Sequence, residues 1–395
     1  MRRGSHTPAD FRDGRVEVKG VSSSETVSTE KLMNIQDLDT PAVLIDADIL
    51  DRNLRRMASY CSAHHITLRP HTKTHKMPEI ARLQMQYGAG GITVAKLGEA
   101  EVMVDAGLTD ILIVYPLWGE KKWTRLAQLA KRARISVAMD SLPVAEGISR
   151  AAKEAGVEIG IRVEFDTGLR RCGLPVNDDS ISIARRVRGL PGLRWEGISL
   201  YPGHIRGVQE ARDRGIAAEN ANLERLFALL DAAGIPYPVV SGGNTPAAFE
   251  SHLFHGVTEI RPGTYVFNDR NTVDAESVSY ADCAATVLTT VVSTSVPGRA
   301  ILDSGSKTLT SDLSGFGDRK YFGHIQDHPD FLLEGLSEEH GHMAVPENSG
   351  VKVGDRLRVV PNHVCPCINL HDRVFVVSGE QVVDEWKVAA RGKVA

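Results

Sequence analysis

The sequence predicts an α/β protein made of a (β/α)8 TIM-type barrel and a second, mostly β C-terminal domain. Between about residues 40 and 270, eight short runs rich in β-branched residues alternate with helix-like segments. Those segments, such as MPEIARLQMQYGA (77–89), have apolar residues at helical spacing and end at glycine. Strict alternation favours a parallel sheet, and eight repeats favour a closed barrel over an open doubly wound sheet. After residue 275, strand-like runs follow one another with almost no helix.

The predicted elements divide the chain into three parts. We expect barrel strands at 66–73, 91–97, 111–116, 135–141, 158–166, 195–204, 236–244 and 259–267. We expect strands of the second domain within 283–296, 299–306, 355–365 and 372–390, joined by the extended run TPAVLIDAD (40–48). The resulting parts are a flexible tail over 1–35, a barrel over 40–272 and a β-domain over 275–393.

The composition is that of an ordinary globular protein. The 395 residues are 42% hydrophobic and 24% charged, with a net charge of −4, so the charge by itself does not indicate a nucleic-acid or anionic-membrane partner. No apolar run approaches the roughly 18 residues of a membrane span, and the polar N-terminus lacks the apolar core typical of a secretory signal. Five scattered cysteines are too few for a disulfide scaffold. We therefore expect a cytoplasmic protein without a nucleic-acid or membrane partner.

The stretch ITLRPHTKTHK (66–76) ends a predicted strand on basic and hydrogen-bonding side chains. Function in a barrel lies at the C-terminal ends of the strands, and a partly desolvated lysine there can form a Schiff base. By itself, Lys73 is more typical of an exposed loop lysine, and we expect Lys76 at the surface. His71 and His75 are expected to share the strand face of Lys73 and to hydrogen-bond near it.

Two glycine-containing turns, SGGNT (241–245) and RPGTY (261–265), follow other predicted strands. Consecutive small residues leave backbone N–H groups free to surround a phosphate. Each turn alone is also typical of an ordinary loop. Together with a lysine across the barrel, they indicate a phosphorylated cofactor.

A third motif, PNHVCPCINLHD (361–372), combines imidazole and thiol groups. In an extended strand, His363, Cys365 and Cys367 would point to one face, and imidazole with thiolate is a good zinc pair. A closed structural site would need His371 as a fourth ligand, whereas a catalytic site would leave a position open. Buried cysteines that act as small hydrophobic residues are the alternative.

Six motifs in this order, RPHTKTHK, DTGLRRCG, SGGNT, RPGTYVF, SEEHGH and PNHVCP, carry a resemblance over residues 40–393. The chain resembles the D-threonine aldolase/D-serine dehydratase family, fold-type III pyridoxal phosphate enzymes related to alanine racemase. The resemblance implies pyridoxal 5'-phosphate and a divalent metal as cofactors. Zinc is favoured over manganese or magnesium because a thiolate is a soft ligand. It also implies a D-3-hydroxy amino acid as the small-molecule substrate, and we expect a homodimer.

The resemblance also implies roles for single residues. Lys73 would form the Schiff base and act as the base at Cα, and His363 and Cys365 would bind the metal. The remaining cofactor contacts would come from Arg171, Tyr201, Ser241, Gly242, Gly243, Asn244, Gly263 and Thr264.

Other residues receive weaker predictions. We expect His204, at a strand end, to serve as a base for the substrate hydroxyl or for a metal-bound water. His71 would hydrogen-bond near Lys73 or near the substrate carboxylate. Cys367 falls where the family pattern needs no ligand. His340 and His342 could line the site from the β-domain or from a partner subunit.

Two lyase reactions stay open. We favour β-elimination of water to a keto acid and ammonia, because His-x-Cys at the metal goes with the dehydratases and His-x-Asp with the aldolases. Retro-aldol cleavage to glycine and an aldehyde is the alternative. Arg261 complicates the choice, since it matches the alanine racemase arginine at the pyridine nitrogen, which disfavours a long-lived carbanion.

More distant alternatives are an amino-acid racemase, a non-catalytic pyridoxal phosphate carrier and an unrelated sugar-phosphate barrel with a structural zinc. A racemase would need a second base, and neither Tyr280 nor Tyr321 lies in a racemase-like motif. Carriers usually lack a β-domain. The third alternative would require all four residues His363, Cys365, Cys367 and His371 to converge.

Overall fold

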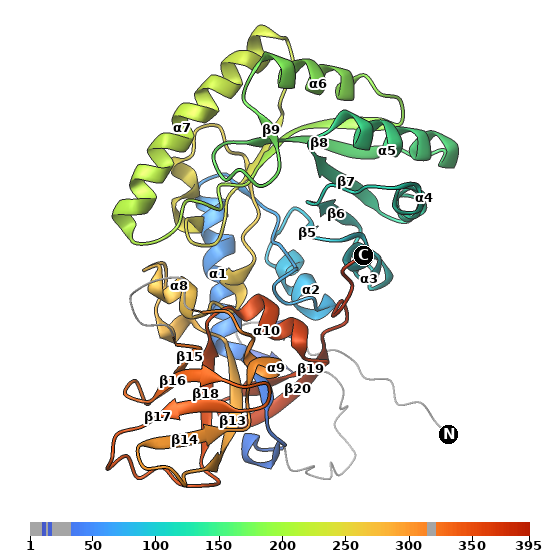
Figure 1. The fold of residues 1–395 in the computed structure, drawn as a ribbon. Helices are drawn as coiled ribbons and strands as arrows, with labels where there is room; N and C mark the ends of the chain where they lie inside the picture. Colours follow the sequence, from blue (N-terminus) through green and yellow to red (C-terminus); the bar gives the residue numbers. More distant parts are fainter. Residues whose placement is uncertain (1–9, 13–14, 18–32, 314–320) are drawn as a thin grey trace, which may run out of the picture.

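The computed structural model describes residues 10–12, 15–17, 33–313 and 321–395, which form a barrel and a β-domain (Figure 1). Most of the predicted tail lies outside the described residues. Within it, β1 (Asp10–Arg12) pairs antiparallel with β2 (Arg15–Glu17).

Eight parallel strands of the described chain follow one path in the first sheet, in the order β4-β12-β11-β10-β8-β7-β6-β5. A bridge between His71 and Thr93 joins the two ends of this path, so the sheet curls into a barrel and the predicted fold class is confirmed. A further short strand, β9 (Leu174–Pro175), pairs with β8. The eight strands are β4 (Thr67–Leu68), β5 (Ile92–Val94), β6 (Asp110–Ile113), β7 (Arg134–Met139), β8 (Ile159–Asp166), β10 (Leu193–Leu200), β11 (Val239–Gly242) and β12 (Glu259–Ile260).

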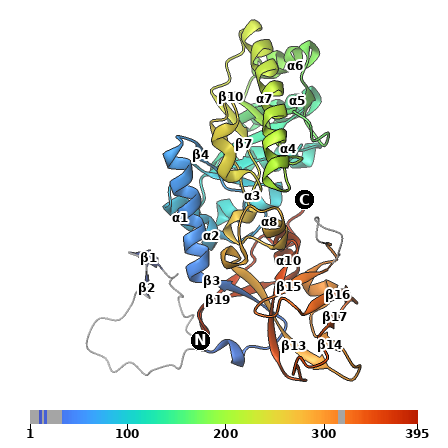
Figure 2. The same ribbon diagram turned by 90° about the vertical axis from the view of Figure 1, so that its left-hand side faces the viewer.

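Amphipathic helices surround the barrel strands (Figures 1 and 2). In the first of them, Leu50, Leu54, Met57 and Cys61 recur every three to four residues and are all buried. The helices are α1 (Ala47–Ala63), α2 (Pro78–Gln86), α3 (Leu97–Asp105), α4 (Glu120–Leu129), α5 (Leu142–Ala155), α6 (Asp178–Arg188) and α7 (Gln209–Ala232).

Charged side chains occupy part of the barrel interior, where branched aliphatic residues usually pack. Glu259 accepts from Arg69 Nε at 2.7 Å and from Arg162 NH1 at 2.5 Å, and all three residues are buried. Burial opposes ionisation of Glu259, but the two guanidinium groups lower the pKa of its carboxyl to about 2. The barrel core is therefore held partly by ion pairs, and Glu259 is fully ionised at neutral pH.

The sheet of the β-domain runs in the order β16-β17-β14-β13-β3-β19-β20. Off this path, β18 pairs with β13, and β15 pairs with β18. Its strand β3 (Ala42–Asp46) precedes the barrel in sequence, as predicted for the extended run TPAVLIDAD. The other strands are β13 (Ala285–Ser293), β14 (Arg299–Leu302), β15 (Gly323–Ile325), β16 (Leu332–Leu336), β17 (Gly341–Ala344), β18 (Arg356–Pro361), β19 (Arg373–Ser378) and β20 (Gln381–Lys387).

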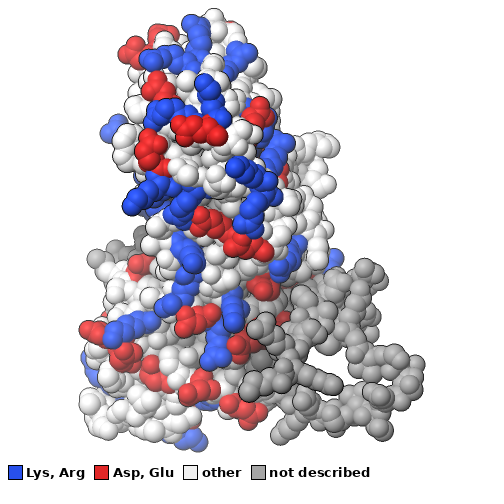
Figure 3. All heavy atoms as spheres, turned by 90° about the vertical axis from the view of Figure 1, so that its right-hand side faces the viewer, with Lys and Arg blue, Asp and Glu red and all other residues white. Residues whose placement is uncertain are grey.

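Three short helices accompany this sheet. α8 (Arg270–Asp274) lies between the last barrel strand and β13, α9 (Ser306–Leu309) follows β14, and α10 (Val364–Leu370) follows β18. Figure 1 shows α10 at the end of the β-domain that faces the barrel. On the face shown in Figure 3, basic and acidic side chains are interspersed. Among the described helices, none has the length and hydropathy required to cross a membrane.

Candidate active site

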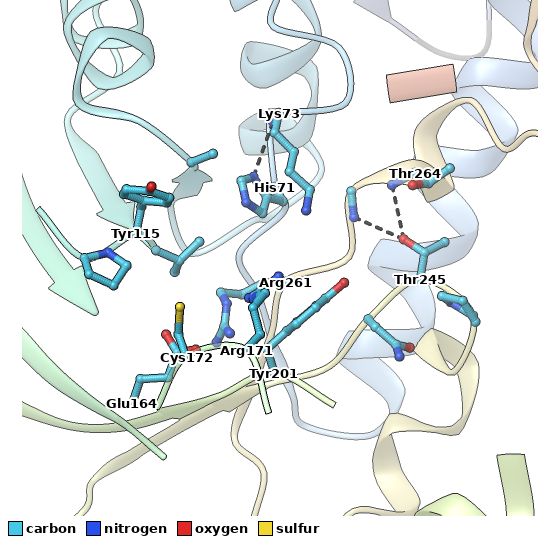
Figure 4. A pocket seen from close by; sticks show the side chains of 16 residues that line it. His71, Lys73, Tyr115, Glu164, Arg171, Cys172, Tyr201, Thr245, Arg261 and Thr264 are labelled. Carbon is cyan, nitrogen blue, oxygen red and sulfur yellow. Dashed lines mark hydrogen bonds between the residues drawn. The ribbon is translucent and has the colours of Figure 1, made fainter. Parts of the chain in front are cut away.

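A cavity of about 440 Å³ lies at the C-terminal ends of the barrel strands. Its lining side chains come from the ends of β4, β5, β6, β8, β10, β11 and β12 or from the residues that follow them (Figure 4). This is the end at which a barrel carries its chemistry. The motifs around residues 73, 171, 201, 244 and 263 thus meet in one place.

Lys73 extends into this cavity (Figure 4), with its Nζ 5.9 Å from the centre of the Tyr201 ring. Its backbone N–H donates to Nδ1 of His71 at 3.3 Å. Burial, and secondarily the charge of Lys73, keeps the pKa of His71 well below its usual value. His71 is therefore a neutral acceptor that orders the turn from which Lys73 projects.

The conformation of this turn shows that the expectations for Lys76 and His75 are wrong. Lys76 is not at the surface: it is 7% exposed, and its Nζ lies 3.0 Å from Oε1 of Glu99. The backbone turns tightly over residues 72–75 and reaches φ +57° at Lys76, which directs this side chain into the protein. His75 does not share the face of Lys73, because the strand ends before it, and its Nδ1 accepts from the N–H of Met77 at 3.1 Å.

Arg171 and Tyr201 lie together beside the cavity. Cζ of Arg171 is 4.5 Å from the centre of the Tyr201 ring, within the range of a cation–π contact. The loop that carries Arg171 is held by Asp166, whose Oδ1 accepts from the N–H groups of Gly168 at 3.0 Å and Arg170 at 2.9 Å. Two residues predicted to contact the cofactor are thus adjacent although they follow different strands.

The two glycine-containing turns meet at Thr245. Its Oγ1 accepts from the backbone N–H groups of Gly263 at 3.2 Å and Thr264 at 3.1 Å. A phosphate oxygen that replaced the Thr245 hydroxyl would find both N–H donors already directed at one point. A Cβ on Gly263 would lie 2.8 Å from Oγ1 of Thr74 and 3.0 Å from the carbonyl oxygen of His71, so a larger residue would force these neighbours to shift.

Two polar side chains of the SGGNT turn bind protein atoms. Ser241 Oγ donates to Oε1 of Glu259 at 2.6 Å, and Asn244 Nδ2 donates to the carbonyl of Pro202 at 2.7 Å. Gly243 has φ +80°, and a Cβ there would meet Ile260 at 3.0 Å. Ser241 and Asn244 therefore shape the turn through their side chains, so a phosphate contact at either position would use backbone N–H groups.

Arg261 both braces the strand ends and borders the cavity. Its NH1 donates to Ser241 Oγ at 2.5 Å and its NH2 to the carbonyl of Leu200 at 2.8 Å. Burial lowers the pKa of Arg261 to about 10, so the guanidinium stays charged at neutral pH. Glu164 lies beside it, and burial raises the pKa of this carboxyl against the opposing charges of Arg261 and Arg171.

The motif predicted to bind a metal comes from the β-domain and contacts Thr264, a residue that lines the cavity. Sγ of Cys365 lies 3.2 Å from Oγ1 of Thr74 and 3.7 Å from Oγ1 of Thr264. These threonines stand next to Lys73 and Gly263, so the motif adjoins both the lysine and the phosphate-type turn.

The extended conformation predicted for this motif is wrong, because α10 begins directly after His363. Residues two apart on a helix point roughly 200° apart, so Cys365 and Cys367 face different ways. Sγ of Cys367 and Nε2 of His371 both contact the carbonyl of Thr308, at 3.3 and 3.1 Å. Across residues 33–313 and 321–395, no three His, Cys, Asp or Glu side chains are grouped as metal ligands, which argues against the four-ligand structural zinc.

His363 and Cys365 form a polarised pair. Burial opposes charge on both, but their mutual hydrogen bond raises the pKa of His363 to about 9 and lowers the pKa of Cys365. A divalent metal that displaces the proton shared by this pair would meet a thiolate and a neutral imidazole, with the remaining positions left to water or substrate. The pair therefore fits an open metal site.

The other predicted histidines do not line the cavity. His204 lies beside Gly168, with its Nε2 3.9 Å from Oε2 of Glu219. His342, in β17, has its Nε2 2.9 Å from Oγ of Ser337, and His340 is exposed in the turn before that strand. Their roles stay predictions.

Glu219 is fully buried, and burial raises the pKa of its carboxyl to about 7. The unfolded chain therefore binds fewer protons than the folded protein between about pH 4.5 and 7, so stability falls as pH rises through this window. We expect this group to lower the free energy of unfolding by about 3 kcal/mol across the window. Glu219→Gln should remove that loss.

Chemical denaturation at pH 5 and pH 8 measures this effect. Glu224→Gln, on the same helix but exposed, is the matched control and should keep the wild-type pH dependence. Equal pH dependence in wild type and Glu219→Gln would show that Glu219 titrates normally.

Residues that sequence reasoning missed include Glu164 and Thr245. Glu164 stands inside the run RVEFD and resembles any strand residue. Thr245 ends the SGGNT motif. Its hydroxyl, a hydrogen-bond acceptor in a loop of small residues, is the feature of the sequence that could have indicated a contact with the RPGTY turn. Neither role follows from local pattern alone, because both depend on which strand ends meet.

Comparison with known proteins covers nearly the whole described chain. The model of "Alanine racemase, N-terminal domain" matches residues 45–271, and that of "Putative serine dehydratase domain" matches residues 284–377. A D-threonine aldolase of Arthrobacter sp. is 36% identical over 90% of this chain and 93% of its own. A D-threo-3-hydroxyaspartate dehydratase of Delftia sp. (strain HT23) is 34% identical over 83% of this chain and 91% of its own.

Solved structures agree with these matches. The D-threonine aldolase from Filomicrobium marinum superposes with a TM-score of 0.85 at 33% identity, covering 93% of this chain and all of that one. A cysteine-to-alanine mutant of D-threo-3-hydroxyaspartate dehydratase in the metal-free form gives a TM-score of 0.81 at 32% identity, covering 90% and 98%.

Proposed function

Because the chain belongs to the D-threonine aldolase/D-serine dehydratase family of alanine racemase-like enzymes, we propose that it is a pyridoxal phosphate- and metal-dependent lyase acting on a D-3-hydroxy amino acid. The reaction we propose is β-elimination of water, giving a keto acid and ammonia. One observation carries this proposal: Cys365 of the β-domain contacts both Thr74, the neighbour of Lys73, and Thr264, which lines the barrel cavity.

The residues at the cavity fit the cofactors. Lys73 offers the amine, the N–H groups of Gly263 and Thr264 converge as a phosphate needs, and Arg261 borders the cavity with a positive charge. His363 and Cys365 would hold the metal, and the thiolate favours zinc. When bound, pyridoxal phosphate supplies electron withdrawal from Cα and the metal supplies a Lewis acid.

In the proposed elimination, Lys73 would transfer the proton, and Arg171 and Tyr201 would form the walls of the cavity around it. Lys73, with its amine free, would take the proton from Cα. The electron pair of that C–H bond would form the Cα–Cβ double bond as the bond from Cβ to the hydroxyl breaks. The proton held by Lys73 would join the departing hydroxide to make the water that is lost. The released enamine is hydrolysed to a keto acid and ammonia. Arg171 and Tyr201 wall the cavity around Lys73 and restrict its direction of approach.

Retro-aldol cleavage is the second candidate, supported by the likeness to two D-threonine aldolases. It would need a base at the substrate hydroxyl, and His204 does not line the cavity. A racemase finds less support. Within the described residues, Tyr280 stacks on His324 at 3.8 Å and the Tyr321 ring lies under Arg270, so neither tyrosine borders the cavity.

The test is product analysis with D-serine, D-threonine and D-3-hydroxyaspartate, using the L-enantiomers as controls. We expect keto acid and ammonia from at least one D-substrate, loss of activity with a chelator, and recovery with zinc. Glycine and an aldehyde as the products would establish the aldolase instead, and appearance of the L-enantiomer would establish a racemase.

We also propose that the protein is a homodimer and that it is cytoplasmic. Both follow from the family resemblance and the composition. Light scattering coupled to size-exclusion chromatography tests the first.

A further inference from the structure

A carboxylate from a distant part of the chain contacts the metal-binding histidine. Nδ1 of His363 lies 2.9 Å from Oδ2 of Asp312, which is 51 residues earlier in the sequence. An ionised carboxylate only accepts hydrogen bonds, so Nδ1 of His363 is the donor in this contact. When a metal displaces the other ring proton, Nε2 is therefore the nitrogen that can bind it.

The backbone of Asp312 is fixed to the same strand end that carries His363. Its carbonyl accepts from Nδ2 of Asn362 at 2.9 Å, and Asn362 is 1% exposed and directly precedes His363. The N–H of Asp312 donates to Oγ1 of Thr310 at 3.1 Å. Asp312 is thus held from both sides, independently of the contact between its carboxylate and His363.

The turn that leads to Asp312 is strained. Thr310 has φ +76° and ψ 170°, a conformation that only glycine adopts readily. Such a residue costs of order 1–3 kcal/mol, and strain of this kind gathers at functional sites. The side chain of Thr310 is nearly buried and supplies the acceptor for the Asp312 N–H, so the strained residue itself directs Asp312.

From these contacts we propose that Asp312 is a positioning residue that fixes the tautomer and ring orientation of His363 for metal binding. The proposal rests on the metal role of His363 proposed above. Carboxylates that receive the second ring N–H of a histidine ligand raise its basicity and hold its ring, and their loss typically weakens metal affinity 10- to 100-fold. Asp312 does not need to touch substrate to have this effect.

The test compares zinc affinity in Asp312→Ala, Asp312→Asn and wild type, by competition with a chromogenic chelator. We expect Asp312→Ala to bind zinc about 10- to 100-fold more weakly, and Asp312→Asn, which keeps an acceptor for Nδ1, to fall between the two. Visible absorbance of the lysine-bound cofactor and the thermal midpoint show that each variant is folded and loaded. Asp372→Asn, an exposed carboxylate just beyond α10, is the matched control and should match wild type.

Three results separate the possible failures. Unchanged zinc affinity in folded Asp312→Ala, together with loss of zinc in Cys365→Ala, would overturn the role of Asp312 and leave the metal site intact. No zinc bound by wild type would overturn both the role of Asp312 and the metal dependence. Loss of cofactor absorbance in step with loss of zinc in Asp312→Ala would show a general disturbance of the site and would also overturn the positioning role.

Discussion

Lys73→Ala is expected to remove the visible absorbance of the bound cofactor and to lower kcat by about 10³-fold or more. In the proposed reaction one amine would supply both the covalent anchor and the base at Cα, so a single substitution should remove two contributions. The structure gives Lys73 a cavity, an aromatic neighbour in Tyr201 and a turn ordered by His71. Absorption spectra of the purified protein and steady-state rates measure the two effects separately.

Lys96→Met provides the matched control. Lys96 lies near the same cavity, with its Nζ 3.3 Å from the centre of the Tyr115 ring, but nothing in its surroundings suggests a covalent role. We expect this variant to keep the cofactor absorbance. If Lys73→Ala kept it too, the cofactor would be anchored elsewhere and the assignment of Lys73 would fall.

Cys365→Ala is expected to abolish zinc binding and to lower kcat by about 10²-fold or more, since a Lewis acid is worth several kcal/mol in the transition state. Metal content by mass spectrometry and rates with and without chelator measure both. The cofactor should stay bound, because Lys73 and the phosphate-type turn belong to the barrel.

Cys367→Ala separates thiol chemistry from damage to the helix. Cys367 stands on the same helix as Cys365, but its Sγ contacts the carbonyl of Thr308 on another side. This variant should keep both zinc and activity. Equal loss in the two variants would mean that α10 had been disrupted, and full activity of a zinc-free Cys365→Ala would remove the metal from the mechanism.

The alternation of strands and helices could be read from the sequence because it is a local pattern. Each barrel strand is a short β-branched run between turn residues, and the motifs that follow strands had to meet at one end of a parallel barrel. That rule alone was enough to predict that Lys73, Tyr201 and Gly263 lie close together. The family resemblance added the pairing of His363 with Cys365.

The remaining features depend on partners far away in sequence. Lys76 looked like a surface lysine because nothing near it reveals that Glu99 will lie 3.0 Å from its Nζ. The same holds for Asp312, whose partner is 51 residues away. The helical turn after His363 did leave a signal: Pro366 suits the first turn of a helix, where its missing N–H is not needed.

The position of β3 has a consequence for the order in which the protein is made. Ile45 pairs with Ala285 and Phe375 pairs with Leu44, so a strand synthesised before the barrel becomes a central strand of a sheet completed after it. The ribosome must release the whole barrel before this sheet can close, and the entropy of joining such distant segments slows that step. The barrel is in effect an insertion between two strands of its companion domain. A fragment beginning at β13 would lack β3, and the metal motif would depend on a sheet missing one of its inner strands.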